Sequence, residues 1–171
     1  MVVPVMLLWW VKDRRQMKLY GFQSQDNWRL YALLLACMLP LVIAAAQLPD
    51  FLAVYPKAIK DAGLTRSDSI TNFLLFELTY ALDFFSIEFF FRGFLILAFV
   101  KYAGMGAIVP AACFYCCIHF GKPMPEAISS FFGGLLLGII SYHTKSIWGG
   151  LFIHLGIALL MEVAAFMTRH F

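Results

Sequence analysis

The chain is a succession of long apolar segments separated by short polar breaks, and this pattern constrains its fold most. Of its 171 residues, 62% are hydrophobic and 13% are charged, whereas soluble domains are about 25% charged. In a bilayer the backbone must satisfy its own hydrogen bonds, which favours helices. We therefore expect an all-α fold, a multi-spanning transmembrane helix bundle with about 5–6 spans of about 20 residues each.

The apolar segments follow one another without a stretch that resembles a linker between domains. Residues 1–171 are therefore expected to form a single membrane domain. Residues 1–11 are apolar but too short to cross about 30 Å of hydrocarbon. They are either the end of a truncated first span or a helix lying at the membrane interface. The remaining expected spans cover residues 29–48, 69–100, 106–119, 126–142 and 147–167.

The distribution of charge gives an orientation. If each segment crosses once, more lysines and arginines fall on the side of loops 12–28, 101–105 and 143–146 than on the other side. The positive-inside rule therefore predicts that these three loops are cytoplasmic. The net charge of +3 is not gathered into a basic run with interleaved aromatic residues, so no nucleic-acid partner is expected.

Charged side chains occur inside the long apolar segment 69–100. Glu88 and Arg92 are spaced i, i+4, so they lie on one helix face and can pair. Each costs about 2.5–3.5 kcal/mol to place in a membrane. Glu77 falls on the same stripe, whereas Asp83 points about 120° away. The pair either fixes helix packing alone or serves a polar site.

Two histidines lie in later apolar segments. Glu88 and His119 each lie about 20 Å from loop 101–105, so an antiparallel helix pair would place them side by side. His154 joins them only if residues 141–147 dip into the bundle. A carboxylate in such a site can act as a general base toward water. Neighbouring histidines can stabilise an oxyanion or bind a metal.

These residues resemble the motifs of the CAAX-protease and bacteriocin-processing family, also called the Abi family. Residues 88–95, EFFFRGFL, are similar to its EExxxRGxL signature, and Tyr115-xxx-His119 and residues 146–154 fit its second and third motifs. The resemblance covers residues 72–160, about half of the chain.

The resemblance implies an intramembrane protease, or metalloprotease, that hydrolyses peptide bonds of membrane-associated substrates. Glu88 would activate water, Arg92 would orient Glu88, and His119 and His154 would stabilise the oxyanion. Alternatively, His119, His154 and Glu88 would bind a divalent metal such as zinc. The expected partners are a peptide or membrane-protein substrate and the lipid bilayer. The expected location is integral to a bacterial plasma membrane.

Two positions depart from the family pattern. Ile87 stands where the first glutamate is expected, and Ala158 stands where an asparagine is expected. Asp83, one turn before Ile87, is a candidate substitute base. The alternatives are therefore a catalytically inactive relative acting as an immunity or scaffold protein, and a small transporter or proton relay.

Overall fold

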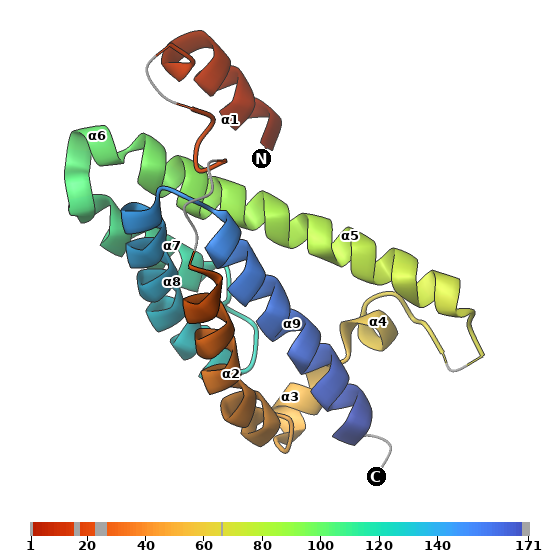
Figure 1. The fold of residues 1–171 in the computed structure, drawn as a ribbon. Coiled ribbons are helices and arrows are strands. Elements are labelled where there is room, and N and C mark those ends of the chain that lie inside the picture. Colours follow the sequence, from red (N-terminus) through yellow and green to blue (C-terminus); the bar gives the residue numbers. More distant parts are fainter. Residues whose placement is uncertain (1, 16–17, 23–26, 66, 169–171) are drawn as a thin grey trace. The chain divides into compact units, whose positions relative to one another are not determined.

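The computed structural model describes residues 2–15, 18–22, 27–65 and 67–168, and the expected all-α fold is confirmed for them. Apart from turns and short irregular segments, these residues are helical, with one isolated antiparallel bridge between Phe22 and Ser146. The helices are shown in Figure 1. In chain order they are α1 (Val2–Leu8), η1 (Trp9–Asp13), α2 (Trp28–Ala45), α3 (Pro49–Val54), α4 (Lys57–Lys60), α5 (Ile70–Glu88), η2 (Phe89–Ala98), α6 (Val100–Ala103), η3 (Gly104–Ala107), α7 (Ile108–Cys117), α8 (Met124–Thr144) and α9 (Trp148–Thr168).

Four stretches of the described chain are long and apolar enough to cross a membrane: Trp28–Ala45, Ile70–Cys117, Met124–Thr144 and Trp148–Thr168. The second is 48 residues long, and it contains both segments that the sequence analysis separated at residues 101–105. The protein is therefore an integral membrane protein with a helical bundle. The expected number of about 5–6 spans agrees only approximately with these four stretches.

The chain forms two compact units, which we describe separately. The first unit comprises Met1–Trp28 and Phe85–Phe152, and the second comprises Arg29–Phe84 and Ile153–Phe171. One division follows the first residue of α2, and the other two fall inside α5 and α9, so these two long helices contribute to both units. A single membrane domain over residues 1–171 stays a prediction.

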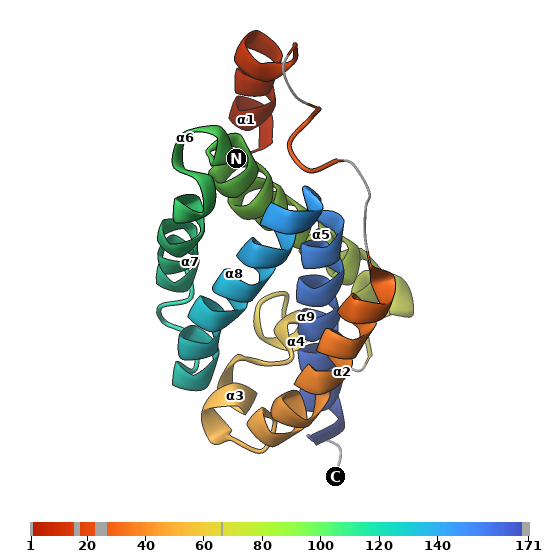
Figure 2. The same ribbon diagram turned by 60° about the vertical axis from the view of Figure 1, so that its left-hand side comes forward.

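In the first unit, α7 packs beside α8 (Figure 2). Small residues on α8 make this close approach feasible. A Cβ atom at Gly134 would lie 3.3 Å from the Cα of Ala112, and one at Gly138 would lie 2.9 Å from Cγ2 of Ile108. Glycine at these two positions lets the helices approach more closely than larger residues would allow.

The N-terminal helix is held to the first unit by a buried polar cluster. Asp13, at the end of η1, accepts hydrogen bonds from the Tyr20 hydroxyl and from Nζ of Lys101. Burial by itself would raise the pKa of Asp13, but these two hydrogen bonds, together with the positive charges of Lys101 and Lys12, outweigh it and hold the pKa below its usual range. Val5 of α1 packs with Phe89 in the same core. The apolar N-terminal residues are therefore helical and packed along one face.

In the second unit, residues 49–68, which lie between two of the expected spans, contain two short helices, α3 and α4. Pro49 occupies the first turn of α3 and Asp50 follows it; both residue types are favourable at a helix start. Phe51 stacks on Tyr55 with ring centroids 4.8 Å apart, and both are buried with Ala165 of α9. Packing of these two aromatic rings explains why this polar segment is folded.

Candidate functional site

The site of the first unit begins where the hydrogen-bonding pattern of a long helix changes. Residues 70–98 are continuously helical, but α5 ends at Glu88 and the π-helix η2 begins at Phe89. Segments of π-helix occur frequently at functional sites. The expected long apolar segment is therefore unbroken, and its change of helix type falls between Glu88 and Arg92.

Glu88 and Arg92 form the predicted ion pair. Nη1 of Arg92 lies 3.2 Å from Oε1 of Glu88, and the two side chains are 1% and 0% exposed. Removing two charges from water is expensive, and a buried pair is tolerated only when its partners neutralise each other. The i, i+4 spacing therefore gives a neutral polar unit inside an apolar helix.

Gly150 allows a second helix to reach the carboxylate. It lies in the first turn of α9, and a Cβ atom added there would lie 2.5 Å from Oε2 of Glu88. A side chain would displace the carboxylate. The positive end of the α9 dipole also favours a negative charge at this place. Gly150 was not predicted as a site residue, although the adjacent glycines 149–150 in the third motif were a signal for close backbone approach.

Tyr115 of α7 connects the ion pair to a histidine. Its buried ring lies 4.5 Å from Cζ of Arg92, measured to the ring centroid. On the other side, its centroid lies 4.6 Å from that of the His119 ring. A guanidinium over an aromatic face is attracted by the ring quadrupole. Tyr115 was not predicted as a site residue, although its i, i+4 spacing from His119 places the two on one face.

His119 follows α7 and is buried, with 7% of its surface exposed. Its Nδ1 lies 2.8 Å from the carbonyl oxygen of Tyr115. Because a carbonyl oxygen only accepts, Nδ1 carries the proton and donates. Neutral His119 therefore presents Nε2 as a proton acceptor, and it donates from Nε2 only as imidazolium. Contacts through Tyr115 thus join Glu88, Arg92 and His119 in the first unit.

The other two predicted site residues belong to the second unit. His154 of α9 is half-buried, and its ring meets that of Phe84 edge to face with centroids 4.5 Å apart. Asp83 is exposed on α5, so it lacks the burial that distinguishes Glu88. The convergence of His154 with Glu88 and His119 stays a prediction.

A divalent metal site was the alternative expectation for Glu88, His119 and His154. Among the described residues, no three His, Cys, Asp or Glu side chains are grouped so that they could hold a metal ion. In the first unit, Glu88 and His119 would supply two ligands, whereas catalytic zinc sites usually use three from the protein. Glu88 and His119 alone therefore supply fewer ligands than a catalytic zinc site uses, and metal binding by Glu88, His119 and His154 together stays a prediction.

Together, the fold and the site define an integral membrane protein of the all-α class, with a carboxylate, a guanidinium and an imidazole in its interior. A protein-family model described as type II CAAX prenyl endopeptidase Rce1-like matches residues 69–160, more than half of the chain. The chain belongs to this family, which confirms the resemblance seen in the sequence. At family level, its function is that of a CAAX-type intramembrane protease. Searches of curated proteins and of solved structures found no match.

Proposed function

We propose that the protein is an intramembrane endopeptidase that hydrolyses peptide bonds of membrane-associated substrates at Glu88. The observation that carries the proposal is the buried Glu88–Arg92 pair, set against the first turn of α9 and linked through Tyr115 to His119. If the Glu88–Arg92 pair served helix packing alone, no contact through Tyr115 to a histidine would be required. Membership of the protease family supports the same reaction.

In the proposed reaction, Glu88 accepts a proton from a water molecule whose oxygen attacks the scissile carbonyl carbon. Protonated His119 or His154 donates a hydrogen bond to the resulting oxyanion. The C–N bond then breaks, and the proton held by Glu88 passes to the leaving amine. Arg92 positions Glu88 through the ion pair. Ligation of a divalent metal such as zinc is the alternative role of Glu88 and the histidines, and no step here depends on it.

Ile87 occupies the position where the first glutamate of the motif is expected. Glu88 is therefore the only glutamate of the motif that can act as the general base. Glu88 is fully buried and paired, whereas Asp83 is exposed. Because a base shielded from bulk water can hold a single reactive water in place, Glu88 is the stronger candidate. The departures at Ile87 and Ala158 favour one second function, a non-catalytic relative acting as an immunity or scaffold protein.

The test uses the full chain in liposomes with a library of membrane-tethered peptides, with products identified by mass spectrometry. We expect cleavage by the wild type and a loss of about 10²–10⁴-fold in rate for Glu88→Gln. His119→Ala and His154→Ala should each also reduce the rate, whereas Glu126→Gln, which alters a partly buried pair with Lys122, should not. A wild type that cuts nothing, or variants that cut equally well, would favour the non-catalytic function.

A further inference from the structure

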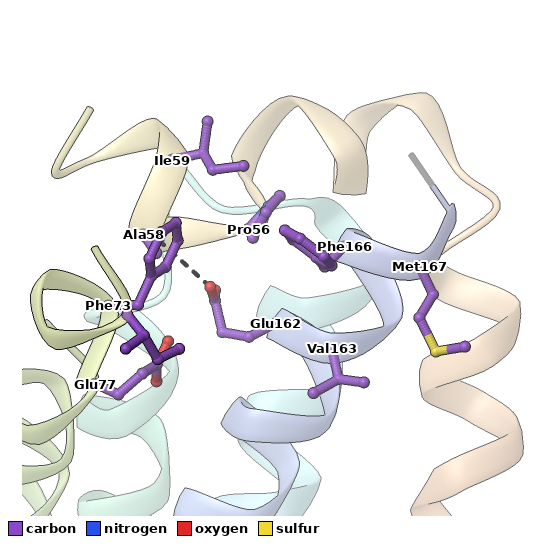
Figure 3. A pocket seen from close by; sticks show the side chains of 10 residues that line it. Pro56, Ala58, Ile59, Phe73, Glu77, Glu162, Val163, Phe166 and Met167 are labelled. Atoms are coloured by element: carbon purple, nitrogen blue, oxygen red, sulfur yellow. Dashed lines mark hydrogen bonds between the residues drawn. The ribbon is translucent and has the colours of Figure 1, made fainter. Parts of the chain in front are cut away.

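The second unit contains a pocket of about 760 Å³ that the peptidase proposal does not use (Figure 3). It lies between the start of α4, the first half of α5 and the end of α9. Pockets that bind small organic molecules usually have volumes of about 300–1,000 Å³. The size of this pocket therefore suits a small organic molecule.

The walls of the pocket are apolar, and its polar lining is acidic. Ile70, Phe73, Val163 and Phe166 are among the apolar lining residues. Among the ten lining side chains, the polar ones are two carboxylates, Glu77 and Glu162, and neither lysine, arginine nor histidine contributes to the lining. The pocket therefore combines negative charge with a hydrophobic wall.

Glu162 has a structural partner inside the second unit. Its Oε1 accepts a hydrogen bond from the backbone N–H of Lys57 at 2.6 Å, and its Oε2 accepts one from Ala58 at 3.4 Å. These are the first two N–H groups of α4, which have no partner within the helix. Glu162 thus caps α4 while its side chain lines the pocket.

Glu77 differs from Glu162 in this respect. Its Oε2 is buried and has no hydrogen-bond partner among the described residues. Buried polar atoms of native proteins are normally hydrogen-bonded, and an exception calls for a missing partner. Figure 3 shows Glu77 and Phe73 of α5 and Val163 of α9 among the side chains that line the pocket. A hydrogen-bond donor that enters the pocket would supply the missing partner.

We infer that this pocket binds a single-chain amphiphile whose head group is a primary ammonium. The ammonium complements the charge of the two carboxylates and can donate three hydrogen bonds, of which Oε2 of Glu77 accepts one. The rings of Phe73 and Phe166 add a favourable surface for a cation. The alkyl chain covers Val163 and Met167, which are exposed at the rim. A quaternary ammonium has no N–H group and would leave Glu77 unsatisfied.

The experiment measures binding of n-octylammonium to the full chain in phosphatidylcholine nanodiscs, by isothermal titration calorimetry. We expect saturable binding, and binding about tenfold or more weaker for Glu77→Gln, because a charge-assisted hydrogen bond is lost. Octyltrimethylammonium should also bind about tenfold more weakly than octylammonium. Glu126→Gln, which replaces a glutamate of the first unit, is the matched control and should bind as the wild type does.

Val163→Trp provides a second test that leaves both carboxylates in place. The larger side chain fills the pocket from its exposed rim, so octylammonium binding should be lost while the thermal unfolding temperature is kept. Equal binding by the wild type, Glu77→Gln and Val163→Trp would mean that octylammonium only partitions into the bilayer, and the inference would be overturned. Preference for octyltrimethylammonium would overturn the choice of a primary amine.

Discussion

The two units bury carboxylates among apolar helices in different ways. In the first unit, Glu88 is neutralised by Arg92 one turn further along the chain. In the second unit, Glu162 is neutralised in part by backbone N–H groups 104 and 105 residues away, and Glu77 has a buried oxygen without a partner. An ion pair between residues one helical turn apart can be predicted from their spacing in the sequence. A carboxylate that caps a distant helix cannot, because it depends on how distant segments pack together. The first arrangement is an ion pair within one continuous helical segment; the second lines a pocket.

The sharpest contrast should come from removing one charge in each unit. Glu88→Gln leaves Arg92 buried without a counter-charge, which we expect to destabilise the protein by about 3–5 kcal/mol. Glu77→Gln removes a carboxylate that has no cationic partner among the pocket-lining residues, so stability should be unchanged or slightly higher. The measurement is reversible unfolding in mixed micelles with increasing denaturing detergent.

The double variant Glu88→Gln/Arg92→Met separates stability from catalysis. Replacing a buried ion pair with uncharged side chains of similar size is often neutral or stabilising, so the double variant should regain most of the lost stability. Peptide cleavage should stay absent because the proposed base is missing. If Glu88→Gln is as stable as the wild type, the pair does not hold the first unit together and the comparison between the units fails.

A second prediction concerns the tight packing around Glu88. Gly150→Ala would place a methyl group 2.5 Å from Oε2 of Glu88, so the carboxylate must move. A displacement of about 1 Å in a catalytic group can cost about 10²-fold in rate. We expect a loss of that order in the rate of peptide cleavage at substrate saturation.

Gly133→Ala is the matched control for Gly150→Ala. Gly133 is also a helical glycine of the first unit, but a Cβ atom there meets nothing within 4 Å. Alanine should therefore leave cleavage unchanged and favour the helix by about 1 kcal/mol at most. Equal rates for both variants would show that the position of Glu88 does not depend on the close approach of α9.

The features that follow from local spacing could be predicted from the sequence. The apolar segments predicted the helices, and the i, i+4 spacing of Glu88 and Arg92 predicted their pairing. The order of three motifs predicted the family. Each of these depends on residues close together in the chain or on composition, so no knowledge of tertiary packing was needed.

The features that depend on tertiary packing were missed. The role of Gly150 follows from the approach of α9 to Glu88, and that of Tyr115 follows from the way α7 packs beside η2. The short helices α3 and α4 lie between two expected spans, in a segment for which no helix was predicted. There, burial of Phe51 and Tyr55 and capping by Glu162 override the local composition, as tertiary contacts commonly override weak propensities.

The smallest effect is expected at the cap in the second unit. Glu162→Gln keeps one carbonyl oxygen that can still accept from Lys57, but it loses the charge and the second acceptor. Loss of a helix N-cap costs about 0.5–2 kcal/mol, and we expect the lower end because one hydrogen bond remains. Amide hydrogen exchange at Lys57 and Ala58 should become a few-fold faster, while exchange in α7 and α8 stays unchanged.

Glu77→Gln is the control, because none of the hydrogen bonds described for α4 involves Glu77. If exchange at Lys57 and Ala58 is unaltered, the carboxylate of Glu162 does not stabilise α4. Both carboxylates of the pocket would then be available to a ligand.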